Sequence, residues 1–558
     1  MCGIFALLNQ TYHNPDTRRK IMEFFNKTNK RGPDYSTIKC NHKIQVTLGF
    51  HRLAINGLDD TSNQPFNIDG IQLICNGEIY NYKEMYTLLG VTPNTNSDCE
   101  VIIHLYKKYG IEKTLQLIDG VFAFCLIDND TIFVARDPLG VRPLYEVVYD
   151  NYSYGFSSTL SALTDITNDT TINCNNNVNI TQYPPGTYSC YKYVNTNETY
   201  RWEFSYEGVY FSINTIQQYI HTPIEQTIKL VRTSLEEAVK KRVNNCDRDI
   251  ACLLSGGLDS SLITSIVNKY YKKKTGKSVK TFSIGMEGSC DLKYARKVAE
   301  FLQTNHTEIC LTESEFLEAI PEVIYHIESY DTTTVRASVG NYLIAKYIKE
   351  HCDAKVIFNG DGSDEVTGGY MYFHYAPNHY EFDMECKRLL RDIIYFDVLR
   401  SDRTISSNGL EARTPFLDKN FVSTYLSIPS SLRFDTTKEH CEKYILRKAF
   451  DDGETLPDEV LWRTKEAFSD GVSKQTRSWY EIIQEFVETD TIHNNNNSFE
   501  TYTYMTPTTG EQLYYRNIFN SYYKNCEDII PYFWMPKFID AADASARTLT
   551  IYKNKVGK

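Results

Sequence analysis

The sequence lacks long apolar runs and an excess of positive charge. No apolar stretch reaches the ~18 residues that a membrane-spanning helix requires. Lysine and arginine number 59 against 71 aspartate and glutamate residues, which gives a net charge of −12. Nucleic-acid binding favours a basic surface, and a signal peptide would place a charged segment before an apolar one. We therefore expect a cytoplasmic protein that binds neither a membrane nor nucleic acid.

Metal and disulfide signatures are also missing. The 15 cysteines are scattered along the chain, none of them as Cys-x-x-Cys, and no His-Glu-x-x-His occurs. Free thiols in a reducing cytosol explain this cysteine usage better than a disulfide framework does.

Length and pattern predict two domains, because 558 residues exceed what one hydrophobic core usually holds. Residues 1–204 show short strand patterns separated by turns. Examples are a hairpin at 121–135, strands at 46–55 and 71–80, and helical periodicity at 18–25 and 98–108. This mixture is typical of an α+β domain.

Residues 205–222 lack periodicity and are predicted to be a linker. In residues 223–558, strands at 249–254, 279–284 and 355–358 alternate with helices at 227–243, 258–271 and 291–302. The alternation predicts an α/β domain with a doubly wound parallel sheet and a ligand at the carboxyl ends of its strands. Asparagine-rich segments at 173–179 and 493–498 are expected to be surface loops.

Cys2 directly follows the initiator Met1. Removal of Met1 would give Cys2 a free α-amine beside its thiol. An amine with a pKa near ~8 can act as the general base of a thiol nucleophile. Any residue can follow an initiator methionine, so the significance of Cys2 depends on motifs farther along the chain.

The segment Ser255-Gly-Gly-Leu-Asp-Ser260 lies between a predicted strand and a predicted helix. Two glycines permit a tight turn that brings several N–H groups to an anion at a helix N-terminus. The segment is not Gly-x-x-x-x-Gly-Lys-Ser/Thr, which excludes a kinase-type P-loop. It resembles the pyrophosphate loop of the N-type ATP pyrophosphatases, which implies that ATP is a substrate.

A second loop, after the predicted strand at 355–358, carries Asp361, Asp364 and Glu365 among glycines. Mg²⁺ binds through one or two carboxylates together with phosphate oxygens. We therefore predict that Asp259 and Asp364 are Mg²⁺ ligands.

With Cys2-Gly-Ile-Phe5 and both loops, the chain resembles the glutamine-hydrolysing asparagine synthetases over nearly its whole length. Further matching segments are Arg31-Gly-Pro-Asp34, His51-Arg-Leu-Ala-Ile55, Asn76-Gly-Glu-Ile-Tyr-Asn81, Ser97-Asp-Cys-Glu100, Arg136-Asp-Pro-Leu-Gly140, Tyr330-Asp-Thr-Thr-Thr-Val-Arg-Ala-Ser338, Asp397-Val-Leu-Arg-Ser-Asp-Arg403, Asn408-Gly-Leu-Glu-Ala-Arg-Thr-Pro-Phe-Leu-Asp418, Glu442-Lys443 and Leu461-Trp-Arg-Thr-Lys-Glu-Ala-Phe-Ser-Asp-Gly471. The resemblance implies an Ntn-hydrolase-like αββα sandwich, the glutaminase domain, at residues 1–204. It implies an ATP pyrophosphatase domain at residues 223–558.

The implied activity is ATP-dependent synthesis of L-asparagine from L-aspartate through β-aspartyl-AMP, with ammonia released from L-glutamine. AMP, pyrophosphate and glutamate would be the other products. A closed, apolar passage between the domains would keep the ammonia away from water. The implied partners are small-molecule substrates, the implied metal ion is Mg²⁺, and the implied assembly is a homodimer.

In the glutaminase domain the resemblance implies that Cys2 attacks the glutamine amide. Asn76 and the N–H of Gly77 would form the oxyanion hole. Arg52 would bind the glutamine α-carboxylate, and Glu78 and Asp98 its α-ammonium. The backbone of the pocket would come from Leu53, Ala54, Ile55 and Asn56.

In the second domain the resemblance implies catalytic roles for Asp361, Arg400 and Lys443, the last beside the leaving pyrophosphate. Thr334, Arg336 and Asp397 would contact aspartate or AMP. The implied ATP contacts are Leu253, Ser255, Gly256, Gly257, Asp259, Ser260, Ile284, Asn359 and Gly360.

Two departures from the family pattern affect these expectations. The family has Ser-Gly-Glu where this chain has Asn359-Gly360-Asp361, which shortens the carboxylate side chain by one bond, on the order of 1.5 Å. Slower amination or a shifted substrate would follow. The family has a glutamate where this chain has Thr159, which removes a negative charge.

Other functions share some of these features. A β-lactam synthetase-like cyclase tends to lose the N-terminal cysteine or the glutamine pocket, and both are intact here. An amidotransferase of purine synthesis lacks Ser-Gly-Gly-Leu-Asp-Ser. The retained site residues disfavour a non-catalytic homologue, and an enzyme that prefers ammonia to glutamine remains open.

Overall fold

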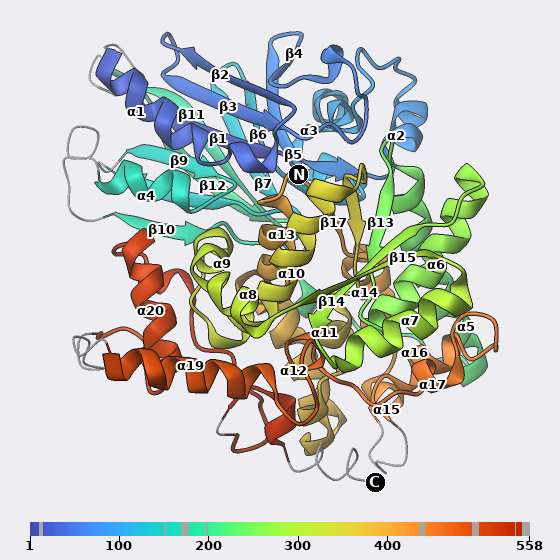
Figure 1. Cartoon of the computed structure of the whole chain (residues 1–558). Coiled ribbons are helices and arrows are strands. Elements are labelled where there is room, and N and C mark those ends of the chain that lie inside the picture. Colours follow the sequence, from blue (N-terminus) through green and yellow to red (C-terminus); the bar gives the residue numbers. More distant parts are fainter. Residues whose placement is uncertain are drawn as a thin grey trace. The chain divides into compact units, whose positions relative to one another are not determined.

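The computed structural model describes residues 1–10, 15–149, 152–168, 178–196, 199–434, 441–493, 502–541 and 543–549. The chain forms two units (Figure 1). Unit 1 comprises residues 1–212, 406–410 and 522–529, and unit 2 comprises residues 213–405, 411–521 and 530–558. Of the loops expected at 173–179 and 493–498, residues 173–177 and 494–498 lie outside the described residues, whereas Asn179 begins β10 and His493 ends α19. Among the described helices, none has the length and apolar content needed to cross a membrane.

Unit 1 contains two six-stranded antiparallel sheets. Sheet A has the order β10 (Asn179–Gln182), β8 (Tyr145–Tyr149), β9 (Ser153–Ser157), β1 (Gly3–Leu8), β3 (Val46–Arg52) and β2 (Tyr35–Asn41). Sheet B has the order β12 (Thr199–Val209), β11 (Thr187–Thr196), β7 (Thr131–Arg136), β6 (Gly120–Asp128), β5 (Ile71–Ile79) and β4 (Phe66–Ile68). The helices of unit 1 are α1 (Pro15–Asn26), α2 (Tyr82–Leu89), α3 (Val101–Leu117) and α4 (Ser161–Asn168).

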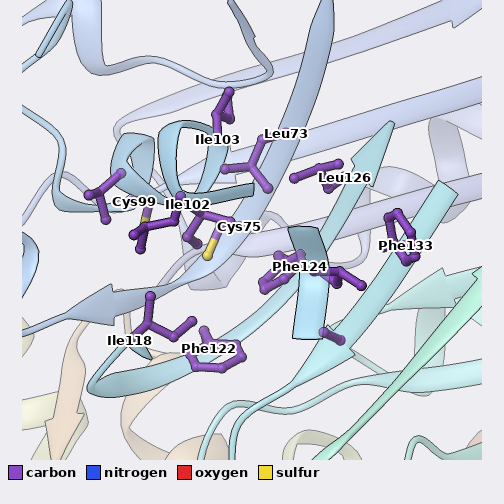
Figure 2. Packing of buried hydrophobic residues seen from close by; sticks show 14 of the residues in the cluster. Leu73, Cys75, Cys99, Ile102, Ile103, Ile118, Phe122, Phe124, Leu126 and Phe133 are labelled. Atoms are coloured by element: carbon purple, nitrogen blue, oxygen red, sulfur yellow. The ribbon is translucent and has the colours of Figure 1, made fainter. Parts of the chain in front are cut away.

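The strand β6 shows how the core of unit 1 is built, because successive side chains of a strand point to opposite faces. Phe122 and Phe124 pack with Ile102 and Ile103 of α3 in one buried cluster, which Figure 2 shows. Residues 123, 125 and 127 of the same strand belong to a second cluster, shared with strands of sheet A. Burial on both faces explains why residues 121–127 form an unbroken apolar run.

The predicted elements of unit 1 are present, with one difference at the C-terminal end. The hairpin predicted at 121–135 is β6 and β7, and the strands predicted at 46–55 and 71–80 are β3 and β5. The predicted linker, however, begins inside a strand, because β12 stays paired with β11 as far as Val209, with one register shift at Cys190 and Tyr191. Its outer residues Phe204 and Tyr206 are about half exposed. An edge strand with apolar residues on its exposed side has no alternating pattern to mark it.

Unit 2 is built on a five-stranded parallel sheet with the order β15 (Asn305–Leu311), β14 (Lys280–Met286), β13 (Ile250–Leu253), β16 (Val356–Phe358) and β17 (Glu411–Arg413). Strands β13, β14 and β16 were predicted, whereas β15 and β17 were not. The chain moves outward from β13 on one side to β14 and β15, and on the other side to β16 and β17. The strand order therefore reverses between β13 and β16, which is where a doubly wound sheet binds its ligand.

Helices pack around this sheet, and their bounds follow local sequence signals. The helix α6 begins after Gly257 and ends at Gly276, whose φ of 73° suits a residue without a Cβ atom. The helices of unit 2 are α5 (Ile224–Asn244), α6 (Leu258–Thr275), α7 (Cys290–Leu302), α8 (Glu313–Glu318), α9 (Ile320–Ile327), α10 (Thr332–His351), α11 (Ser363–Thr367), α12 (His379–Asp392), α13 (Asp397–Ser406), α14 (Lys419–Leu426), α15 (Ser430–Arg433), α16 (Tyr444–Ala449), α17 (Asp458–Leu461), α18 (Phe468–Gly471), α19 (Trp479–His493) and α20 (Gly510–Tyr522).

Candidate functional site

In unit 2, the two loops singled out in the sequence meet at the carboxyl edge of the sheet. One loop joins β13 to α6 and the other follows β16. They touch so closely that a Cβ atom on Gly360 would lie 2.7 Å from the backbone nitrogen of Ser260. The two loops can therefore approach this closely only because residue 360 is a glycine. The parallel pairing of β13 with β16 brings two sequence-distant motifs to one place.

The loop before α6 is held in a compact turn by its two serines. The Ser255 backbone N–H donates to the Ser260 hydroxyl at 3.1 Å, and the two hydroxyls are 2.9 Å apart. Gly256 has a φ of 73°, and a Cβ atom there would lie 2.4 Å from the nitrogen of Ala295. The turn precedes the positive end of the α6 dipole, an arrangement that favours an anion such as a phosphate group.

A cavity opens beside these loops, and its lining combines apolar with charged residues. The apolar lining includes Leu253, Phe282, Ile284, Ala337 and Ile344. The polar and charged lining residues include Ser255, Asp259, Ser260, Asn359, Asp361, Asp364, Asp397, Arg400, Lys443, Arg463, Lys465 and Glu466. A lining that has both apolar and charged residues suits a ligand that carries a flat ring as well as phosphates.

Two lysines join the two carboxylates predicted to bind a metal ion. Lys443 Nζ lies 2.7 Å from both Asp259 and Asp364, and Lys465 Nζ lies 3.4 Å from Asp259 and 2.6 Å from Asp364. Burial alone would raise the pKa of Asp259, but Lys443 and Lys465 bring it below its ordinary value. Burial likewise lowers the pKa of Lys465, and Asp364 and Asp259 raise it above its usual range. Asp259 and Lys465 are thus charged at neutral pH.

Lys443 is held in an unusual backbone conformation. Its φ is 62° and ψ is 29°, the left-handed region, just before α16 begins. A residue with a Cβ atom adopts this conformation at a cost of the order of 1 kcal/mol. The ion pairs with Asp259 and Asp364 hold the side chain, which is 1% exposed, at the cavity wall.

A second charged group lies on the same cavity wall. Arg400 contacts Asp397 and lies 3.2 Å from Asp361. Asp397 also accepts a hydrogen bond from the N–H of Gly362 at 2.9 Å. Burial raises the pKa of Asp397 to about 6, although Arg400 opposes this shift. Among the described residues, the buried Nε atom of Arg400 has no hydrogen-bond partner, which leaves one donor for a ligand.

Two residues expected to contact aspartate or AMP do not line this cavity. The hydroxyl of Thr334 donates to Asp331 at 2.7 Å within the first turn of α10. Arg336 is buried between Glu511, at 2.6 Å, and Asp543, at 2.8 Å. The α10 residues that line the cavity are Thr333, Ala337, Asn341 and Ile344. The matching segment was thus informative, but the helical phase decides which of its side chains face the ligand.

The segment 463–469 supplies cavity residues that the motif analysis did not assign. Lys465 is the clearest, with contacts to Asp259 and Asp364. Arg463 donates to the carbonyl of Gly256 at 3.1 Å and so joins this segment to the loop before α6. The only sequence signal was the matching segment from Leu461 to Gly471, which carried no stated role.

Beside this segment, Asp291 of α7 gives a testable pH dependence. Burial raises its pKa to about 7, although Arg463, 3.3 Å away, lowers it. The folded protein therefore binds this proton more tightly than the unfolded chain does, and Asp291 lowers the free energy of unfolding as pH rises from about 4 to about 7. Asp291→Asn removes the titrating carboxyl group. We therefore expect the unfolding temperature of the variant minus that of the wild type to be larger at about pH 8 than at about pH 5. An identical difference at both pH values would contradict the assignment.

In unit 1, Cys2 lies between Met1 and β1 and is partly exposed. Its thiol donates to the carbonyl of Leu53 at 3.7 Å, and its own carbonyl accepts from Arg31 Nε at 2.9 Å. The Met1 ammonium donates to the carbonyl of Leu410 at 3.2 Å. The strand β1 pairs with β3, which carries Arg52 at its end, so the predicted nucleophile and the predicted glutamine pocket are neighbours.

Asn76 and Gly77 lie side by side in β5. The Nδ2 atom of Asn76 is buried, with no hydrogen-bond partner among the described residues. A buried amide donor without a partner is costly unless a ligand completes it. A Cβ atom on Gly77 would lie 2.7 Å from the carbonyl oxygen of Val121, so only glycine fits beside β6. The pair fits an oxyanion hole that substrate would complete.

Arg52 is 5% exposed, and its guanidinium binds oxygen atoms of uncharged groups. It donates to the carbonyl of Asp59 at 2.9 Å, to Asn63 Oδ1 at 2.7 Å and to the carbonyl of Gly57. Within the described ranges no carboxylate lies at ion-pair distance from it. A buried cation without an anionic partner is suited to bind a carboxylate ligand.

The acidic residues of the predicted glutamine pocket are buried close by. Asn56 Nδ2 donates to Glu78 at 2.5 Å, and Asp98 accepts from the backbone N–H of Ile79 at 2.6 Å. The N–H of Ala54 donates to Asp34 at 2.8 Å, which fixes the chain between Leu53 and Ile55. Thr159 accepts from the hydroxyl of Ser161 at 3.2 Å.

Comparison with known proteins covers the whole chain. The asparagine synthase family matches residues 230–385 and 376–532, and the glutamine amidotransferase domain family matches residues 1–202. The asparagine synthetase (glutamine-hydrolysing) of Gallus gallus is 40% identical over 573 residues, covering 100% of both chains. The enzyme of the same name from Homo sapiens is 40% identical over 576 residues, again covering 100% of both chains. Among solved structures, the glutamine phosphoribosylpyrophosphate amidotransferase of B. subtilis matches 50% of this chain and 65% of its own, with 18% identity and a TM-score of 0.29.

Proposed function

The chain belongs to the family of glutamine-hydrolysing asparagine synthetases, and from that premise we propose that its two sites perform the two halves of one reaction. It is a ligase that makes L-asparagine from L-aspartate at the expense of ATP, with ammonia taken from L-glutamine. The observation that carries this conclusion is the 40% identity over the full length of both chains.

Unit 1 is assigned to glutamine hydrolysis, with the Cys2 thiolate attacking the side-chain amide. The unpaired Asn76 amide and the N–H of Gly77 would stabilise the tetrahedral oxyanion. Arg52 would pair with the α-carboxylate, because it is buried and binds only neutral oxygen atoms. Glu78 and Asp98 would take the α-ammonium. Two antiparallel sheets with helices packed outside them support an Ntn-hydrolase-like αββα fold for this part of the chain.

Unit 2 is assigned to activation and amination of aspartate. The β-carboxylate attacks the α-phosphorus of ATP, pyrophosphate leaves, and ammonia then displaces AMP from β-aspartyl-AMP. The loop at Ser255 and Ser260 and the ammonium groups of Lys443 and Lys465 would bind the phosphates. Leu253 and Ile284 would flank the adenine, a role supported by their place among the apolar residues that line the cavity.

Asp259 and Asp364 are suited to hold Mg²⁺, because both carboxylates contact Lys443 and so lie close together on the cavity wall. Within the described part of the chain no group of three or more acidic, histidine or cysteine side chains forms a metal site by itself. A two-carboxylate site fits Mg²⁺, which takes its remaining ligands from phosphate and water. Bound there, the ion would neutralise phosphate charge.

The test of the proposed function is product analysis with aspartate, ATP and Mg²⁺, and either glutamine or ammonium as the nitrogen source. We expect asparagine, AMP and pyrophosphate from both sources, and glutamate only with glutamine. ADP in place of AMP, or no asparagine from either source, would overturn the proposal.

Arg52→Lys tests the glutamine pocket. Lysine keeps the positive charge but loses the planar fork that binds a carboxylate through two parallel hydrogen bonds. We expect the KM for glutamine to rise by roughly 10- to 100-fold, as the loss of about 1.5–3 kcal/mol of charged hydrogen bonding implies. Ammonium-dependent synthesis should stay at the wild-type rate. An unchanged KM for glutamine would exclude Arg52 from this role.

A further inference from the structure

Asp361 is the cavity carboxylate with the weakest ionic contacts. Asp259 and Asp364 each contact two lysines, and Asp397 contacts Arg400. Asp361 lies 3.2 Å from Arg400, and its side chain is 17% exposed. A carboxylate that lines a cavity with little ionic pairing is available to accept a proton from a reacting group.

The remaining lining carboxylate is not available in this way. Glu466 lies 2.9 Å from Arg463 and 2.6 Å from Arg547, so two guanidinium groups neutralise it. Among the acidic residues that line the cavity, Asp361 is therefore the one whose position depends mainly on a neutral partner. That partner is Asn359.

Asn359 holds Asp361 through both ends of its amide. Its Nδ2 atom donates to Asp361 Oδ2 at 2.6 Å, and its Oδ1 atom accepts from the backbone N–H of Asp361 at 3.4 Å. The same Nδ2 atom donates to Ser401 Oγ on α13 at 2.8 Å. Asn359 is 4% exposed and directly follows β16, so the surrounding structure holds its side chain in place. Asparagine can supply all three contacts because its amide carries two N–H donors and one acceptor.

The lengths of the two side chains are complementary. Serine at position 359 would end one bond earlier and carry a single O–H donor, so it could not reach a short carboxylate at position 361 and Ser401 together. Glutamate at position 361 would extend one bond farther and compensate for the shorter partner. The number of side-chain bonds, summed over positions 359 and 361, is thus the same for asparagine with aspartate as for serine with glutamate.

We propose that Asn359 is a positioning residue for Asp361, and that the two side chains act as one unit in the amination step. This inference rests on the proposed function. When ammonia attacks the acyl carbon of β-aspartyl-AMP, a C–N bond forms and the nitrogen becomes positively charged. Asp361 accepts a proton from that nitrogen, the C–O bond to AMP breaks, and AMP leaves with the bonding electron pair. Asn359 keeps the carboxylate at the distance that this transfer requires.

The test separates adenylation from amination in the full-length enzyme. Aspartate-dependent exchange of labelled pyrophosphate into ATP reports adenylation without ammonia, and asparagine formation from ammonium reports both steps. For Asn359→Ser we expect asparagine formation to fall roughly 10- to 100-fold, since positioned acid–base groups contribute about that much or more. Pyrophosphate exchange should fall by a clearly smaller factor than amination does, a selective loss that a general folding defect would not produce.

The double variant tests whether the two positions are coupled. Asp361→Glu alone should also slow amination, because the longer side chain does not fit beside Asn359. The double variant Asn359→Ser/Asp361→Glu should recover at least about tenfold over the worse single variant, a coupling that neighbouring residues can show. Additive losses would overturn the inference. So would equal losses of exchange and amination in Asn359→Ser.

Ser401→Ala distinguishes the proposed role from simple support of α13. It removes the second partner of Asn359 and leaves the contact with Asp361 in place. We expect a lower unfolding temperature and a much smaller loss of amination than in Asn359→Ser. If Ser401→Ala reproduces the selective loss, Asn359 acts through α13 and the inference is wrong. Wild-type enzyme that makes no asparagine would instead overturn the proposed function itself.

Discussion

Cys2→Ala is expected to abolish glutamine-dependent synthesis and leave ammonium-dependent synthesis intact. The substitution removes the thiol that would attack the glutamine amide. Loss of a nucleophile of this kind lowers turnover by on the order of 10³-fold or more. Glutamate release from glutamine should fall by the same factor. Asparagine formation from ammonium measures the second site separately.

The matched control for this prediction is Cys40→Ala. Cys40 lies on β2 in the same unit, is also partly exposed, and is free. We expect it to keep both activities, so a loss in Cys2→Ala alone would trace to the nucleophile. Two results would contradict the assignment: glutamine-dependent synthesis that survives in Cys2→Ala, or ammonium-dependent synthesis that is lost with it.

Lys465→Ala is expected to stop asparagine formation from both nitrogen sources. Lys465 lies 2.6 Å from Asp364 and 3.4 Å from Asp259, at the cavity wall assigned to the phosphates. A charged donor that stabilises a phosphoryl transition state contributes about 2.7–4 kcal/mol, so turnover should fall roughly 100- to 1,000-fold. Hydrolysis of glutamine to glutamate should continue, because the described contacts of Lys465 lie in unit 2.

Lys448→Ala is the matched control for Lys465→Ala. Lys448 is a lysine of α16 that pairs with Asp451 at 2.8 Å on the surface and does not line the cavity. An exposed ion pair contributes about 1 kcal/mol or less, so activity should be unchanged. Unfolding temperatures of both variants show whether the loss of a buried ion pair destabilises Lys465→Ala. Wild-type turnover in Lys465→Ala would exclude a role for this ammonium.

The organisation of the chain could be predicted where local signals were strong. The helix α6 follows a glycine-rich turn, and the strands β6 and β7 have an unbroken apolar pattern around a short turn, so each was found close to its observed bounds. The strand β17 could not be found, because it consists of Glu411, Ala412 and Arg413. Its buried Arg413 pairs with Glu411 at 2.8 Å and donates to the carbonyl of Asn245 at 2.7 Å. Such a strand is stabilised by distant partners that no local pattern reveals.

The residues of the candidate sites also divide into those that a local sequence pattern revealed and those that only the fold brought together. Cys2, the Ser255–Ser260 loop and the acidic loop after β16 were recognisable because each has a distinctive residue pattern close to a predicted strand or at the start of the chain. Arg336 was assigned to the ligand from its motif, but it is buried between Glu511 and Asp543, which are far away in the sequence. Lys465 was quoted without a role, because only folding brings it to Asp259 and Asp364.

The sequence by itself determined the family, the order of the two activities along the chain and the residue types that each activity requires. It could do so because nucleophiles, phosphate loops and metal-binding carboxylates need particular side chains at short spacings. Only the tertiary structure decided which residues of a matching segment face the cavity, that two lysines join Asp259 to Asp364, and that Asn359 holds Asp361. Those facts depend on helical phase and on contacts between segments about 40–200 residues apart, where loop closure is opposed by chain entropy and favoured only by the complete fold.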